Sequence, residues 1–234
     1  MEIKLSYPQS WEDVTREQLL VISSLMLKKR TREELLMDLF CRLACIRVAK
    51  WKAGIDEGTP QARYFFFKGK KQFSLSVEAV AKACEDLSFL VDKIGLPECP
   101  LLSINTKLYG TSFKRYYFAD AYFHKYQDTK EVAYFCMMHN ALTGFKIKKP
   151  EKNEIFAVTI WWTGLKEYFK NKYPNVLKEG DGTSNDRTPA DTLQEILAIL
   201  NGNKPHENNQ ILESEVNSVL LALEHIYAAN KDAK

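Results

Sequence analysis

The stretch Thr15–Ile46 reads TREQLLVISSLMLKKRTREELLMDLFCRLACI and contains two clear helix starts. In each, a threonine precedes a Gln or Glu by three residues, at Thr15 and again at Thr31. In such a capping box the Thr hydroxyl accepts from the third following amide, and the Gln or Glu side chain reaches back to the cap amide. Apolar residues then recur at spacings of three and four. The stretch therefore predicts two antiparallel helices joined by a short turn.

The same signals extend along most of the chain. Ser76 is expected to cap a helix that Gly95 ends, and Asp128 is expected to begin a third capping box. Pro174 and the pair Asn201-Gly202 mark two further helix ends. The segment KEGDGTSNDRTP, residues 178–189, has the composition of a linker. The expected later helices cover residues 77–94, 113–126, 128–142, 155–172, 190–200 and 211–230.

A short β-structure interrupts these helices. Residues 64–67 and 72–75 flank Gly69 and predict a β-hairpin, to which residues 1–6 are a candidate third strand. The fold class expected is mainly α, an irregular bundle of about seven to eight helices with one small β-hairpin. The prolines of LPECPLL suggest an N-terminal half at 1–100 and a C-terminal half at 101–234, unless the two form one continuous domain.

Composition places the chain among ordinary globular proteins. The 234 residues carry a net charge of +3 and are 45% hydrophobic, which excludes collagen-like and wholly disordered classes. No apolar run approaches the ~18 residues that span a bilayer, and the first residues do not resemble a signal peptide. The five cysteines form no CxxC pair, which favours reduced thiols. We therefore expect a cytoplasmic protein with no membrane partner.

No catalytic motif is found. The sequence has no GxGxxG, Walker, HExxH or GxSxG pattern, so we expect no enzyme activity and no cofactor. Asp120 and His124 are spaced i,i+4, and Cys136 and His139 are spaced i,i+3 on the next predicted helix. If these helices pack together, the four residues form a candidate metal site. A structural role, with Asp120 bonding a tyrosine hydroxyl, is the favoured interpretation, and metal binding is the alternative.

Residues 113–126 are unusually aromatic, with seven aromatic side chains distributed around the predicted helix. A helix that is apolar on all sides is buried on all sides, which favours a central core helix. The alternative is a surface that stacks on nucleic-acid bases. In that case the phosphate contacts would come from Lys107, Lys114, Arg115 and Lys125.

Charge is distributed unevenly near the C-terminus. Residues 143–178 contain eight lysines and three glutamates, or +5, whereas residues 179–234 contain four basic and ten acidic residues, or −6. Such a dipolar pattern suits a protein contact better than nucleic acid, which favours a strongly basic domain. The candidate partner surface consists of Lys146, Lys148, Lys149, Lys152 and Trp162.

The segment Trp161-Trp162-Thr163-Gly164 gives a sharper prediction. Adjacent helical residues point about 100° apart, so both indoles are not expected to face one core. Trp161 has more apolar neighbours at helical spacing, so we predict that Trp161 is buried and that Trp162 lies near an edge. Gly164 is explained by the close approach of another helix.

Several blocks together resemble an uncharacterised family encoded in tail modules of prophages and related integrated elements of gut anaerobes. The blocks are YPQSWEDVTREQL at residues 7–19, SF with FADAY at 112–122, WTGLK at 162–166 with Tyr173-Pro174, and the C-terminal LQEIL, NG and LLALE. Asp128 fits a capping position common in the family. The resemblance implies a non-enzymatic assembly chaperone or accessory factor in phage tail morphogenesis, with tail components as partners. A nucleic-acid-binding accessory protein, which would use the basic aromatic helix and the lysine-rich loop at residues 146–152, is the alternative.

Overall fold

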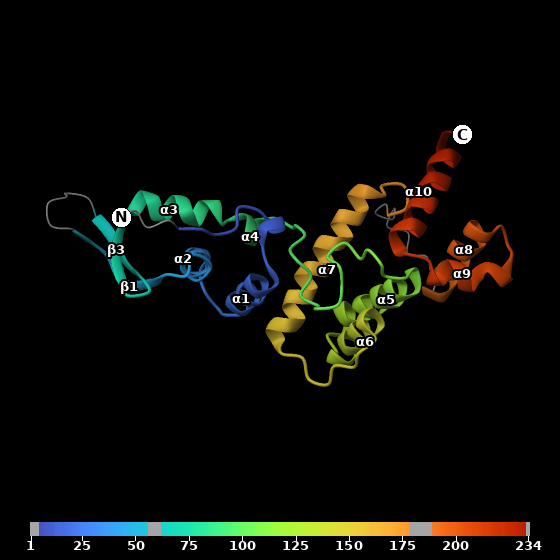
Figure 1. Ribbon diagram of the computed structural model, residues 1–234, viewed down its shortest axis with the longest axis horizontal. Helices are drawn as coiled ribbons and strands as arrows, with labels where there is room; N and C mark the ends of the chain where they lie inside the picture. The colour runs from blue at the N-terminus through green and yellow to red at the C-terminus, as the bar shows by residue number, and fades with distance from the viewer. Residues whose placement is uncertain (1–4, 56–61, 178–188, 233–234) are drawn as a thin grey trace. The chain divides into compact units, whose positions relative to one another are not determined.

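The computed structural model describes residues 5–55, 62–177 and 189–232 (Figure 1). Helices dominate it, and one small antiparallel sheet accompanies them, so the predicted mainly α class is confirmed. The chain divides into two compact units. The first comprises Met1–Pro100 and Lys152–Gly164, and the second comprises Leu101–Glu151 and Leu165–Lys234.

Both predicted capping boxes are present at the start of the first unit. Helix α1 (Arg16–Met26) begins after Thr15, whose hydroxyl accepts from the Gln18 amide at 3.3 Å while the Gln18 side chain accepts from the Thr15 amide at 3.0 Å. Helix α2 (Arg32–Leu43) repeats the arrangement at Thr31. A further capping box, at Ser10, starts the short 3₁₀ helix η1 (Trp11–Asp13), which the sequence analysis did not identify.

The sheet has three strands where one hairpin was expected. Strands β2 (Ala62–Lys68) and β3 (Lys71–Ser76) form the predicted hairpin around Gly69, whose φ is +61°. Strand β1 (Arg47–Ile55) pairs with β2 and was missed. Its register is interrupted twice, which breaks the alternation of apolar and polar residues that identifies a strand. Of the candidate strand at residues 1–6, the first four residues lie outside the described part, and Leu5 and Ser6 are not in a strand.

The helix predicted between Ser76 and Gly95 is shorter than expected. Ser76 does cap α3 (Val77–Asp86), accepting from the Ala79 amide at 3.2 Å. A separate turn, α4 (Phe89–Asp92), follows. Gly95 is not a left-handed C′ residue, so that prediction is wrong. It is instead required by close packing, because a Cβ there would lie 2.3 Å from Cδ1 of Trp11.

The second unit contains α5 (Phe113–Thr129), α6 (Val132–Thr143), α8 (Pro189–Asn201), η2 (Pro205–Glu207), α9 (Asn208–Glu213) and α10 (Val216–Asp232). Helix α7 (Lys152–Lys172) contributes to both units, which divide after Gly164. The predicted linker at 178–189 lies outside the described residues except for Pro189, which begins α8.

Two predicted boundaries in this unit are wrong. Helix α5 continues through Thr129, so Asp128 lies within it and Glu131 is the N-cap of α6. The single helix expected at 211–230 is broken at Ser214, which is extended. The Ser214 carbonyl accepts from the Phe113 amide at 2.8 Å, joining the start of α10 to the start of α5. A tertiary backbone contact thus overrides the helical pattern.

Helix α5 buries one stripe rather than all its sides. Phe113, Tyr116, Ala119 and Phe123 are buried at spacings of three and four, and the Tyr116 ring meets the Phe169 ring edge-on at 5.7 Å. Phe118 on the same helix is exposed. The helix therefore belongs to the core, as the favoured interpretation required, but its aromatic residues continue onto the surface.

Trp161 is fully buried, as predicted, but Trp162 is buried too, with 0% of its surface exposed. The expected edge position is wrong because this part of α7 is enclosed on several sides, with Ala157, Val158 and Leu165 also buried. A Cβ at Gly164 would lie 2.0 Å from the Gly95 carbonyl oxygen. The close approach predicted at Gly164 exists, but it comes from the segment after α4 and not from another helix. Within the described residues, no helix has the length and apolar character that crossing a membrane requires.

Candidate functional site

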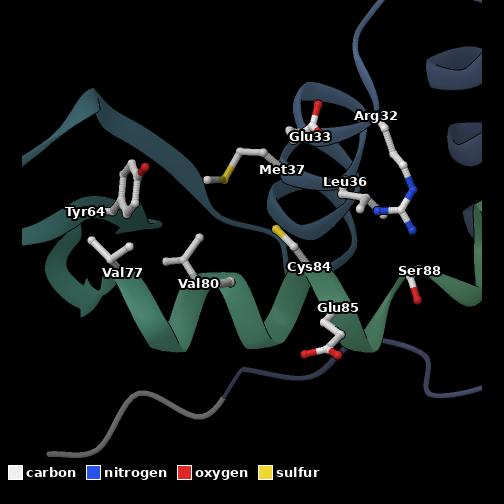
Figure 2. A pocket seen from close by; sticks show the side chains of 11 residues that line it. Arg32, Glu33, Leu36, Met37, Tyr64, Val77, Val80, Cys84, Glu85 and Ser88 are labelled. Atoms are coloured by element: carbon white, nitrogen blue, oxygen red, sulfur yellow. The ribbon is translucent and has the colours of Figure 1, made fainter.

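A groove of about 530 Å³ lies between α2 and α3 in the first unit (Figure 2). One residue of β2, Tyr64, borders it beside the start of α3. The residues that line it come from three elements far apart in sequence. They are Arg32, Glu33, Leu36 and Met37 of α2, Tyr64 of β2, Val77, Val80, Ala81, Cys84 and Glu85 of α3, and Ser88 beyond it.

The lining follows helical periodicity on both sides. Along α3, Val77, Val80 and Ala81 are followed one turn later by Cys84 and Glu85, which is one continuous stripe. At about 1.5 Å per residue, this stripe is roughly 12 Å long. The face that α3 presents to α2 is therefore a row of small and medium-sized side chains.

The floor of the groove is closed and its walls are accessible. Leu36 and Val80 are 4% and 3% exposed, so they belong to the core beneath the groove. Met37 and Cys84 are half-buried, and Ala81 is exposed. Figure 2 shows Met37 reaching from α2, and Val80 and Cys84 from α3, into the space between the helices. Methionine has three rotatable bonds and adapts to irregular partners.

One end of the groove is charged. In Figure 2, Arg32, Glu33 and Glu85 all lie away from Tyr64 and Val77, with Arg32 and Glu33 on α2 and the Glu85 carboxylate below α3. The Arg32 guanidinium pairs with Asp92 at 2.5 Å. Hydrogen bonds from its own backbone amide and from the Thr31 hydroxyl hold the pKa of Glu33 below its ordinary value, so this carboxylate is ionised at neutral pH. One guanidinium and three carboxylates leave the end with a net negative charge.

The thiols beside the groove are protonated at neutral pH. Burial raises the pKa of Cys84 above its ordinary value, and burial, reinforced by Asp38, raises the pKa of Cys41 to about 12. The thiolate is the nucleophilic form of cysteine, so these pKa shifts oppose covalent catalysis here. Cys45, just after the end of α2, is exposed and has a φ of +55°. The groove therefore offers apolar contacts along its length and negative charge at one end.

The residues proposed from the sequence as a partner surface lie elsewhere. Lys146, Lys148, Lys149 and Lys152 are all exposed, between the end of α6 and the first residue of α7. Trp162 is fully buried, so it is not available to a partner, and its assignment to the partner surface is wrong.

The residues of the nucleic-acid alternative are only partly brought together. The Lys107 ammonium lies 4.9 Å from the centre of the Tyr168 ring, and Lys114 pairs with Glu213 at 3.3 Å. Arg115 and Lys125 are exposed on α5. The structure adds Lys172, which was not predicted and whose ammonium lies 5.1–5.7 Å from the ring centres of three tyrosines. Those tyrosines are Tyr109, Tyr168 and Tyr173.

The candidate metal group does not assemble. Asp120 accepts from Lys166 at 2.9 Å and lies 3.6 Å from His124, whereas Nδ1 of His139 bonds the Phe145 carbonyl at 3.1 Å. Burial opposes ionisation of Asp120, but hydrogen bonds from His124 and Lys166 outweigh it and lower the pKa of the carboxyl. In the described parts of both units, no three His, Cys, Asp or Glu side chains converge as metal ligands would.

Sequence reasoning missed the groove because it depends on how two helices and a strand meet. The only signal in the sequence is the row of small residues on α3, where Ala81 and Cys84 follow Val77 at helical spacing. Compared with protein-family models, with curated proteins and with solved structures, the chain gives no match.

Proposed function

We propose that this protein is a non-enzymatic, cytoplasmic scaffold or assembly chaperone that binds other proteins during phage tail morphogenesis. The observation that supports the proposal is the α2–α3 groove, with its closed apolar floor and accessible apolar walls. A chaperone or scaffold holds an apolar segment that would otherwise be exposed to water. The sequence resemblance supplies the biological setting, and tail components are the proposed partners.

Site-specific crosslinking in the native host tests this proposal. A photoreactive benzophenone side chain replaces Ala81 in the groove, and in a matched variant it replaces Ala79, which is exposed on α3 and does not line the groove. Crosslinks to a tail component are expected from position 81 and not from position 79. Equal crosslinking from both positions, or crosslinks at 81 to no tail component, would contradict the proposal.

A second candidate function, nucleic-acid binding, is favoured by the lysine–tyrosine cluster of the second unit. Lys107 and Lys172 both lie against the Tyr168 ring, and Tyr109 is half exposed beside Lys172. Ammonium groups that contact phosphate and exposed rings that stack on bases are the usual combination for single-stranded nucleic acid.

Retention of short single-stranded DNA by the full chain discriminates between the two candidates. If the cluster binds DNA, retention is strong at low salt and decreases steeply as salt is added. The double variant Lys107→Gln/Lys172→Gln should then lose retention, while Lys146→Gln/Lys148→Gln, with the same change in net charge, should retain it. No retention at low salt would eliminate the nucleic-acid function.

A further inference from the structure

We infer that the α2–α3 groove binds one amphipathic α-helix of a partner protein, about eight residues long, with lysine or arginine at the end that lies near Glu33 and Glu85. This inference rests on the proposed protein-binding function and specifies the partner. Three features of the groove carry it: its length, its lack of backbone partners and its charged end.

The dimensions of the groove fit a short helix. The stripe of α3 residues that lines the groove, apolar except for Glu85 at its end, is roughly 12 Å long, which corresponds to about eight residues of a helical partner. Side chains at positions i, i+3 or i+4, and i+7 of such a helix would meet Val77, Ala81 and Cys84 in turn. Met37, opposite them on α2, has a flexible side chain that can adapt to the partner side chains in the groove.

The groove favours a helix over an extended segment. Its walls are two helix faces, whose backbone groups are already bonded within α2 and α3. An extended peptide on these apolar walls would leave its own N–H and C=O groups without partners, which is unfavourable in apolar surroundings. A helix satisfies its backbone groups internally and presents only side chains. The apolar walls therefore select an occupant that carries its own hydrogen bonds.

Charge sets the orientation of the occupant. Arg32 is already paired with Asp92, so the charges at this end that have no ion pair within the described residues are the carboxylates of Glu33 and Glu85. Both residues are exposed and line the groove. A basic side chain on the partner would be attracted to them, and an acidic one repelled.

The test uses fluorescein-labelled, stapled helical peptides of about sixteen residues and the full chain, with binding followed by fluorescence anisotropy. All peptides share leucines at i, i+3 and i+7 on an alanine and glutamine background. One pair ends in two lysines or two glutamines at the C-terminus, and a second pair carries them at the N-terminus. An unstapled peptide with two central prolines has the same leucines and lysines but cannot form a helix.

Four protein variants form two matched pairs. Ala81→Gln places a long neutral side chain in the groove, and Ala79→Gln places the same side chain outside it. Glu33→Gln/Glu85→Gln removes the two groove carboxylates. Glu34→Gln/Glu78→Gln removes two other exposed carboxylates from the same helices, so the change in net charge is identical.

In one of the two peptide pairs, the lysine-ended peptide is expected to bind about tenfold tighter than the glutamine-ended peptide at low salt. At high salt this difference in affinity should be much smaller. This preference should disappear in Glu33→Gln/Glu85→Gln and persist in Glu34→Gln/Glu78→Gln. Ala81→Gln should weaken binding of all peptides at least tenfold, whereas Ala79→Gln should not.

The other outcomes separate the inference from the proposed function. If the proline peptide binds as tightly as the stapled ones, or lysine gives no advantage, while Ala81→Gln still abolishes binding, the basic-helix partner is wrong and the groove remains a protein-binding site. If no peptide binds, or Ala81→Gln and Ala79→Gln behave alike, both the inference and the groove-based function fail.

Discussion

Two contacts in the first unit show opposite ways of joining segments. At Gly164 of α7, the backbone lies against the Gly95 carbonyl so closely that not even a Cβ fits. Between α2 and α3, side chains such as Leu36 and Met37 hold the helix backbones apart and leave an open groove of about 530 Å³. The first contact is closely packed, and we call the buried part of α7 around it the sealed region. The second contact is accessible.

Side-chain size at a contact decides whether the contact can bind a partner. The missing Cβ of Gly164 allows backbone to touch backbone, and the missing Cβ of Gly95 leaves room for the Trp11 side chain. Two tryptophans of the same helix as Gly164, Trp161 and Trp162, are also buried. At the groove, the floor residues are buried but the wall residues are not. We therefore expect substitutions in the sealed region to affect folding stability, and substitutions in the groove walls to affect binding.

The largest effect is expected for Trp161→Ala and Trp162→Ala. Each should lower the free energy of unfolding by about 3–5 kcal/mol, the usual cost of truncating a buried aromatic side chain. Urea denaturation followed by circular dichroism measures this cost. Phe118→Ala, which truncates an exposed aromatic residue, should cost about 1 kcal/mol or less. A similarly small cost for Trp162→Ala would show that the region is not sealed.

Gly164→Ala gives the next largest effect, and its sign is diagnostic. In an open helix, replacing glycine by alanine stabilises by about 1 kcal/mol. Here the new Cβ meets the Gly95 backbone, which has no flexible side chain to move aside. The variant should therefore be less stable than the parent by about 2–3 kcal/mol. Asn171→Ala, at an exposed position of the same helix, serves as control, and a gain in stability for Gly164→Ala would contradict the close contact.

The smallest effect on stability is expected in the groove wall. Ala81 is exposed, so Ala81→Gln should change the free energy of unfolding by no more than about 0.5 kcal/mol, as should Ala79→Gln. The comparison between the two regions fails if Ala81→Gln destabilises the chain as much as Gly164→Ala does. The same urea titration measures all these variants.

The sequence was informative wherever structure is determined locally. The capping boxes at Thr15 and Thr31 place hydrogen-bond partners three residues apart, so both helix starts were predicted correctly. The hairpin around Gly69 was predicted for the same reason, since turn and alternation are local signals. Strand β1 was missed because its two register shifts disrupt that alternation.

Features that depend on distant contacts could not be predicted. Gly95 resembles a helix terminator in the sequence, but the close approach of the Trp11 side chain is what requires it. Trp162 resembles an edge residue when α7 is considered alone, and it is buried because other segments enclose that helix. The groove was missed for the same reason, since it exists only where α2, α3 and Tyr64 come together. By contrast, the candidate partner lysines were correctly expected on the surface, and their role stays a prediction.

If the α2–α3 groove is an open site that a partner covers, the Cys84 thiol should react in the free chain and be protected in the complex. The measurement is a time course of maleimide labelling of the native chain, with the modified cysteines identified by peptide mass spectrometry. Cys84 is half-buried in the groove wall, Cys45 is exposed and Cys41 is buried with a pKa of about 12. These three thiols provide an internal scale.

We expect Cys84 to be labelled more slowly than Cys45 but at least about tenfold faster than Cys41. Because burial raises the pKa of Cys84, its labelling rate should continue to rise above about pH 9. When the partner captured through position 81 is bound, Cys84 should be protected while Cys45 reacts unchanged. Labelling of Cys84 as slow as that of Cys41 in the free chain, or labelling that the bound partner does not slow, would contradict an open groove that a partner covers.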